Sequence, residues 1–88
     1  MPKVEIYTKH NCPFCLRAKA LLGKKGVAFQ EIDAEGEDEI RTWLAEVTGQ
    51  KTVPQIFVDG RSLGGFAELE ALDREGRLDG ILRGSGGG

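Results

Sequence analysis

Apolar and polar positions alternate at the start of the chain and then change to a helical spacing. Val4, Ile6 and Thr8 occupy every second position of VEIYT, which predicts a strand. Four apolar side chains then fall on one face of a helix: Phe14, Ala18, Leu21 and Leu22. Gly26 is suited to end that helix, and VAFQEI at residues 27–32 predicts a second strand. A strand, a helix and a strand of this length form a βαβ unit with parallel strands.

A second helix and a hairpin are expected next. Residues 37–39 are acidic, which favours a helix N-terminus. The apolar residues that follow repeat at helical spacing: Ile40, Trp43, Leu44 and Val47. This spacing makes Trp43 an expected core anchor. Asp59-Gly60 separates two short runs, Gln55–Val58 and residues 61–63, and is a strong signal for a β-hairpin.

The last amphipathic segment follows Gly64 and Gly65. Residues 66–82 predict one helix and a short second helix, separated at Gly76. The order β-α-β-α-β-β-α predicts an α/β fold, a four-stranded mixed sheet with helices on both faces. We expect a single domain over residues 1–83. The tail GSGGG at residues 84–88 has no side chains to pack and is expected to be disordered.

Composition and charge narrow the class of protein. Of the 88 residues, 40% are hydrophobic and 30% are charged, which is ordinary for a folded globular domain. The net charge of -2 gives the molecule no overall attraction to nucleic acid or to an anionic membrane. No apolar run approaches the roughly 20 residues of a membrane helix, and the first residues do not form a signal peptide. We therefore expect a cytoplasmic protein without nucleic-acid or membrane partners. Separately, we expect the protein to be a monomer.

Both cysteines of the chain lie in KHNCPFC, residues 9–15. Cys12 is expected in the loop after the first strand, and Cys15 in the first turn of the helix. The partial positive charge and free N–H groups of a helix N-terminus favour a thiolate. Pro13 fits the first turn, where its missing N–H costs nothing, and Lys9 adds a cation nearby. This setting predicts a reactive Cys12 with a pKa between about 3.5 and 7.5.

Two other uses of the cysteine pair are less favoured. A structural disulfide would close a very short loop and remove little entropy from the unfolded chain. The cytosol also keeps thiols reduced. A zinc site needs four ligands, or three and a water, whereas the chain offers two cysteines and His10. We expect His10 to be an exposed loop residue and expect no bound metal.

A third motif, TVPQIFV at residues 52–58, places Pro54 at the start of a strand. Proline is tolerated there because it need not donate to a ladder. Base rates favour a trans bond, since cis occurs in only about 5% of X-Pro bonds. The motif decides nothing by itself.

Three motifs together carry a resemblance to a known family. CPFC after the first strand, TVPQIFV before the hairpin and GG before the last helix occur in this order over almost the full chain. With them, the chain resembles a glutaredoxin of the dithiol, bacterial type, which has the thioredoxin fold. The segments VEIYTKHNCPFCLRAKALL and KTVPQIFVDGRSLGG are similar to that family's pattern throughout. The resemblance implies an oxidoreductase that reduces glutathione mixed disulfides and protein disulfides, with glutathione as reductant.

The resemblance also implies a role for each motif residue. Cys12 would be the nucleophile, and Cys15 would be the resolving thiol. A cis bond between Val53 and Pro54 would turn the Val53 backbone outward to pair with the cysteinyl part of glutathione. The implied glutathione-binding residues are Lys9, Phe14, Thr52, Val53, Pro54, Gly65, Phe66, Ala67 and Glu68.

Two places depart from the family pattern. Phe14 replaces the tyrosine that is more common in the family. Its ring can still line the glutathione-binding groove that the resemblance implies, but the phenol hydroxyl is lost. Lys9 would meet the glycine carboxylate of glutathione, and the N-terminus of the last helix would hold the γ-glutamyl carboxylate. The family usually has two polar residues at that helix, often ending in aspartate, whereas this chain has Ala67 and Glu68. This difference predicts weaker glutathione binding.

Two alternatives keep the same cysteines. Thioredoxin reductase could supply the electrons, which the poorer γ-glutamyl site favours. A second alternative is a dimer that shares an iron–sulfur cluster through Cys12 and bound glutathione. Pro13 disfavours the cluster, because cluster-binding relatives often have a small residue at that position.

Overall fold

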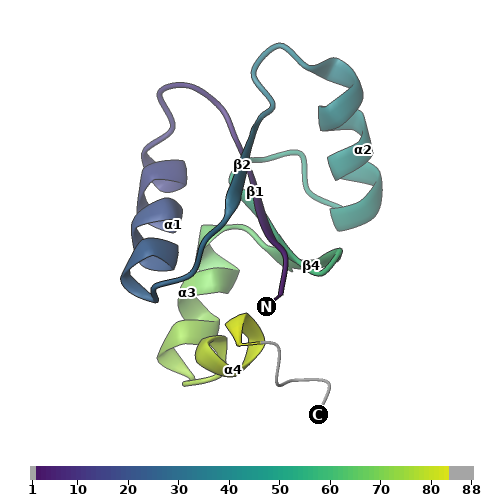
Figure 1. Cartoon of the computed structure of the whole chain (residues 1–88). Coiled ribbons are helices and arrows are strands. Elements are labelled where there is room, and N and C mark those ends of the chain that lie inside the picture. The colour runs from purple at the N-terminus through teal and green to yellow at the C-terminus, as the bar shows by residue number, and fades with distance from the viewer. Residues whose placement is uncertain (1, 84–88) are drawn as a thin grey trace.

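The chain folds into a four-stranded sheet flanked by helices on both faces. The structure, a computed structural model, describes residues 2–83, so the expected tail at residues 84–88 lies outside the described range. The elements in chain order are β1 (Val4–Thr8), α1 (Pro13–Lys24), β2 (Gln30–Asp33), α2 (Asp38–Thr48), β3 (Gln55–Val58), β4 (Arg61–Gly64), α3 (Phe66–Arg74) and α4 (Leu78–Leu82) (Figure 1). Among these elements, no helix has the length and hydropathy needed to cross a bilayer.

The sheet has the strand order β2-β1-β3-β4. β1 pairs in parallel with β2 and antiparallel with β3, and β3 pairs antiparallel with β4. The predicted hairpin is confirmed: Val58 lies opposite Arg61, and Asp59 and Gly60 turn the chain with φ values of 51° and 80°. Positive φ at both central residues is what a two-residue hairpin turn requires. The predicted mixed sheet and thioredoxin fold are therefore confirmed.

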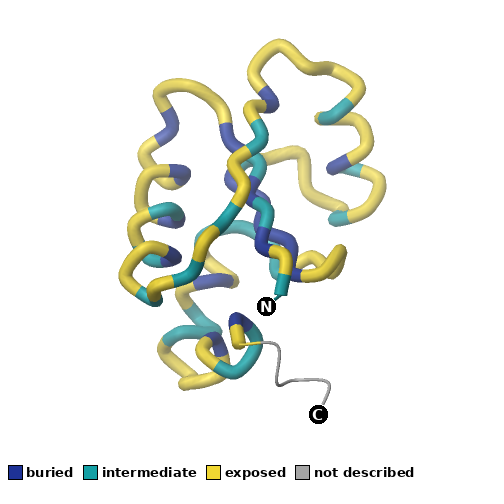
Figure 2. Tube along the Cα trace, viewed as in Figure 1, coloured by how far each residue is buried: buried dark blue, intermediate teal, exposed yellow. Residues whose placement is uncertain are grey.

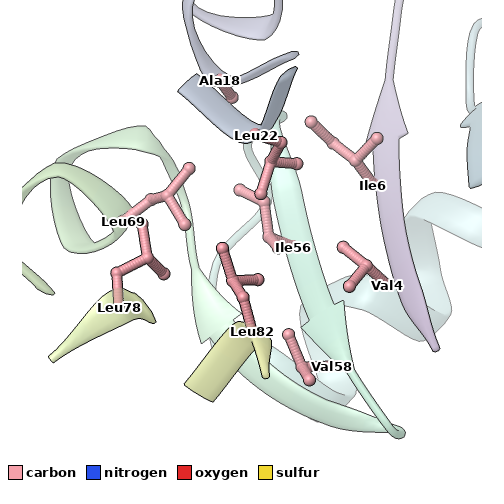
Figure 3. Packing of buried hydrophobic residues seen from close by; sticks show 9 residues of the cluster. All are labelled: Val4, Ile6, Ala18, Leu22, Ile56, Val58, Leu69, Leu78 and Leu82. Carbon is pink, nitrogen blue, oxygen red and sulfur yellow. The ribbon is translucent and has the colours of Figure 1, made fainter. Parts of the chain in front are cut away.

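The main core lies between one face of the sheet and helices α1, α3 and α4. Its buried side chains are Val4, Ile6, Ala18, Leu22, Ile56, Val58, Leu69, Leu78 and Leu82. Figure 3 shows Leu22 from α1 and Leu69 from α3 directed toward Ile56 on the central strand β3. The predicted break between the last two helices is also present, because Gly76 lies between them with a φ of 74°.

Among the elements of residues 2–83, helix α2 alone covers the other face of the sheet, and it is mostly exposed along its length (Figure 2). Its buried residue is Leu44. The expectation that Trp43 is a core anchor is wrong, because Trp43 is 43% exposed. Its ring stacks on Phe57, with centroids 5.5 Å apart, and lies 5.7 Å from Tyr7. With a single helix over this face, the indole covers the sheet on one side and meets solvent on the other.

Two further expectations are corrected. The second strand begins at Gln30 rather than at residue 27. The parallel ladder with β1 starts at the pair Glu5 and Gln30, so residues 27–29 precede the first paired residue of β2. Phe14 does not share the inward face of α1 but is 54% exposed. Cys15 takes the inward position, together with Ala18 and Leu22.

Candidate active site

The two cysteines lie at the N-terminus of α1, just after the carboxyl end of β1. Cys12 is the residue before the helix and Cys15 is in its first turn, as predicted. Their Sγ atoms form a disulfide. Both side chains are buried, Cys15 almost completely, with 2% exposed against 8% for Cys12. Access from solvent therefore favours Cys12 as the first sulfur to meet a substrate.

The helix terminus provides the electrostatic setting for Cys12. The backbone N–H of Cys15 donates to Cys12 Sγ over 3.2 Å. The first turn of α1 contains no acidic residue, so no side chain there opposes negative charge on the sulfur. An N–H donor and the positive end of the helix dipole stabilise a thiolate more than a neutral thiol. Once the disulfide is reduced, this geometry favours the Cys12 thiolate.

The loop before β3 lies next to the cysteines. The bond between Val53 and Pro54 is cis, as the resemblance implied and base rates alone did not. Cys12 Sγ lies 3.9 Å from the carbonyl oxygen of Val53. The sheet brings these segments together, because Tyr7 of β1 pairs with Gln55 of β3. Residues 52–54 therefore meet the loop between β1 and α1 that holds Cys12.

A groove of about 680 Å³ begins at this loop, and its volume suits a small molecule. One wall is the segment 50–54, and the other is the N-terminal part of α3. Eight of the nine residues expected to bind glutathione line the groove: Phe14, Thr52, Val53, Pro54, Gly65, Phe66, Ala67 and Glu68. The Phe14 and Phe66 rings are 5.9 Å apart between centroids and form an apolar part of its lining.

Lys9 is the ninth expected residue, and it does not line the groove. It lines a separate hollow together with His10 and both cysteines. The His10 ring is exposed, as expected, and its Nε2 lies 2.8 Å from the Asp33 carboxylate. Within residues 2–83, no group of three or more histidine, cysteine or acidic side chains is arranged to hold a metal ion.

Several groove residues were not predicted from the sequence. Four more residues line it: Arg17, Gln50, Lys51 and Glu70. Arg17 is exposed, and its guanidinium lies over the Phe14 ring, 5.4 Å from the centroid. Gln55 lies beneath the loop and is completely buried. The sequence did contain a signal for Gln55, namely a polar residue at the start of the strand QIFV, which is buried at all four positions. Buried polar groups require hydrogen-bond partners.

Glu68 occupies the N-terminus of α3. Its Oε1 accepts hydrogen bonds from the Gly65 N–H, at 3.0 Å, and from Gln50 Nε2, at 3.1 Å. The Gly65 N–H and then the Gln50 amide hold the pKa of the Glu68 carboxyl below its usual range, although partial burial opposes this. The groove therefore contains a fixed, ionised carboxylate at neutral pH.

The fold and the cysteine pair point to one kind of chemistry, thiol-disulfide exchange. Two cysteines separated by two residues at a helix N-terminus, facing a cis-proline loop in a thioredoxin fold, form the centre of a thiol-disulfide oxidoreductase.

Comparisons with known proteins identify the family. The family model described as Glutaredoxin matches residues 4–63. "Glutaredoxin 3" of Escherichia coli (strain K12) is 51% identical over 83 residues, which cover 94% of this chain and 100% of that protein. "Glutaredoxin" of Pseudomonas aeruginosa is 51% identical over 82 residues, which cover 93% of this chain and 98% of that protein. The chain belongs to the glutaredoxin family, whose members are thiol-disulfide oxidoreductases.

Solved structures agree with this assignment. The buckwheat glutaredoxin–glutathione complex matches 97% of this chain and 80% of that chain, with a TM-score of 0.88 at 30% identity. The glutaredoxin of Brucella melitensis matches 93% of this chain and 89% of that chain, with a TM-score of 0.84 at 49% identity.

The setting of Cys12 predicts the pH dependence of its reactivity. In the reduced Cys15→Ser variant, which isolates Cys12, the rate of alkylation by iodoacetamide should be half-maximal well below pH ~8.5, the value for a free cysteine. Adding Lys9→Ala should change this midpoint little, because the helix terminus provides most of the stabilisation. A midpoint close to that of free cysteine, measured on the same variant, would contradict the assigned role of the helix.

Proposed function

We propose that this glutaredoxin reduces glutathione mixed disulfides and protein disulfides with glutathione as the electron donor. The observation that carries the proposal is the groove that starts beside Cys12 and ends at the N-terminus of α3. The relative from buckwheat, solved as a glutaredoxin–glutathione complex, supports glutathione as its occupant.

The reaction with a glutathionylated substrate needs only Cys12. The Cys12 thiolate attacks the glutathione sulfur, a Cys12–glutathione disulfide forms, and the substrate cysteine leaves as a thiolate. A second glutathione thiolate then attacks the glutathione sulfur of that disulfide. Oxidised glutathione leaves, and the Cys12 thiolate is restored.

Reduction of a protein disulfide uses both cysteines. Cys12 attacks one substrate sulfur and forms a mixed disulfide, while the other substrate sulfur leaves as a thiolate. The Cys15 thiolate then attacks Cys12 Sγ, which releases the reduced substrate and forms the Cys12–Cys15 disulfide. Two glutathione molecules reduce this disulfide and leave as oxidised glutathione.

The proposed pose follows the groove. The Val53 backbone pairs with the cysteinyl part of glutathione, as an added strand would. The rings of Phe14 and Phe66 lie along the ligand. The N-terminus of α3 faces the γ-glutamyl carboxylate, and the Glu68 carboxylate faces the γ-glutamyl ammonium. Lys9 approaches the glycine carboxylate from the rim beyond Cys12, where its long side chain is exposed.

The same proposal includes the partners, the oligomeric state and the cellular location of the enzyme. Its partners are glutathione and glutathionylated or disulfide-bonded proteins. It works as a monomer in the cytoplasm, where glutathione keeps thiols reduced.

Serine variants of the two cysteines test the proposed roles in an assay coupled to glutathione reductase. Cys12→Ser should abolish turnover of both substrate types, because the nucleophile is lost. Cys15→Ser should retain activity on a glutathionylated peptide and lose reduction of a protein disulfide. Equal loss in both variants on the glutathionylated peptide would refute the roles. Faster turnover of the wild type with thioredoxin reductase than with glutathione would identify a different electron donor.

Ala67 offers a separate test of the γ-glutamyl end. Ala67→Thr adds a side-chain oxygen to the first turn of α3 and leaves Glu68 in place. The KM for a glutathionylated substrate should fall about two- to fivefold, the effect of one exposed hydrogen bond. The kcat should change little, because this end of glutathione is remote from the sulfur. An exposed control, Ala28→Thr before β2, should leave KM unaltered. If Ala67→Thr also leaves KM unaltered, residue 67 does not limit binding.

A further inference from the structure

We propose that Gln50 and Gln55 are positioning residues that hold the two walls of the groove together through Glu68. Their effect on catalysis rests on the proposed function, because the groove matters to turnover only if glutathione occupies it. We refer to Gln50, Gln55 and Glu68 as the amide relay.

The amide relay is an unbroken series of hydrogen bonds. Gln50 Nε2 donates to Glu68 Oε1 over 3.1 Å, and Gln50 Oε1 accepts from Gln55 Nε2 over 2.8 Å. Gln55 Nε2 also donates to the carbonyl oxygen of Thr52 over 2.9 Å. Glu68 Oε1 accepts in addition from the Gly65 N–H. The series therefore begins at the N-terminus of α3, on one wall, and ends at Thr52, on the other.

The charge of Glu68 sets the direction of every bond in the relay. An ionised carboxylate only accepts hydrogen bonds, so Gln50 must turn its NH₂ group toward Glu68. Its carbonyl oxygen then faces Gln55, which must donate with Nε2. Rotating either amide by 180° would place two acceptors or two donors against each other. The Gln55 amide therefore donates to the Thr52 carbonyl oxygen in an orientation that depends on the ionisation of Glu68.

The two glycines before α3 provide the space for this arrangement. A Cβ on Gly64 would lie 2.6 Å from Glu68 Oε1, and Gly64 has a φ of 94°, which side chains rarely adopt. A Cβ on Gly65 would lie 3.2 Å from the Pro54 carbonyl oxygen and 3.9 Å from Gln50 Oε1. The GG motif thus lets the relay and the cis-proline loop pack directly against the start of α3.

The burial of Gln55 indicates that its side chain positions neighbouring groups rather than stabilising the folded protein. The side chain is completely buried, and its Oε1 has no hydrogen-bond partner among the described residues. A buried, unpaired amide oxygen costs free energy that an apolar side chain of the same shape would avoid. The Nε2 group of Gln55, by contrast, donates two hydrogen bonds, and these fix Gln50 and Thr52. The relay also fixes the rotamer of Glu68, so a ligand need not order that long side chain.

The first test follows the coupling by NMR, without substrate. Other charged groups line the groove, namely Arg17 from α1, Lys51 from the loop and Glu70 from α3, so the readout must be specific to the relay. In the wild type, the Glu68 carboxyl carbon and the backbone N–H of Val53, which follows the Thr52 carbonyl, should titrate with one midpoint. Gln50→Met keeps the shape of the side chain but removes both bonds. The Glu68 midpoint should rise, and the Val53 response should disappear. Gln30→Met, the same change on β2 outside the groove, should alter neither.

The second test measures the consequence for turnover of the mixed disulfide of glutathione and 2-mercaptoethanol. Gln50→Met should raise KM about two- to fivefold, with kcat nearly unchanged, because a uniform binding contribution is lost. Gln30→Met should match the wild type. A Val53 signal in the wild type that does not follow Glu68 would overturn the relay. A higher KM without a change in the Glu68 midpoint would mean that Gln50 binds the ligand directly, which also overturns it.

A changed Glu68 midpoint without a change in KM would overturn the positioning role. A wild type that fails to turn over the mixed disulfide at all would instead overturn the proposed function. The NMR titration would still decide whether the relay couples Glu68 to Thr52.

Discussion

The antiparallel register of β1 and β3 is the constraint on which the site depends. Ile6 lies opposite Ile56 and Val4 opposite Val58, and these four side chains form the centre of the main core. A slip of one residue would turn them to the α2 face, so burial specifies the register strongly. The same register brings the cis-proline loop beside the carboxyl end of β1. Cys12 and Val53 meet because a hydrophobic core elsewhere in the sheet requires this pairing.

The second wall of the groove is placed by the same core. Leu69 of α3 is completely buried against it, which fixes the helix and hence the position of its N-terminus. Glu68 precedes Leu69 in the chain and points back over Gly64, where the missing side chain leaves room. The helix terminus at Cys12 favours a thiolate, whereas the helix terminus at Glu68 already carries a carboxylate. One fold thus uses two helix N-termini for different tasks.

Periodicity and turn chemistry were enough to predict most of the fold. The hairpin at Asp59-Gly60 and the break at Gly76 follow from local backbone requirements and were confirmed. Trp43 was misjudged because helical spacing shows which face is apolar, not how much protein covers that face. The reactive setting of the cysteine pair was predicted from a short motif, whereas the cis bond before Pro54 was implied only by the family resemblance, since the motif alone favoured trans. The contact between Gln50, Gln55 and Glu68 was not predicted, because these residues meet only after β3 and α3 have packed together.

We propose that the groove between the cis-proline loop and α3 holds glutathione bound to Cys12. The most direct measurement is an NMR analysis of the Cys15→Ser variant carrying ¹³C-labelled glutathione as a mixed disulfide on Cys12. We expect nuclear Overhauser contacts from the cysteinyl and γ-glutamyl protons to Val53, Phe66 and Ala67. Contacts of the γ-glutamyl protons to His10 and Asn11 in the hollow on the Lys9 side, with none to α3, would contradict it.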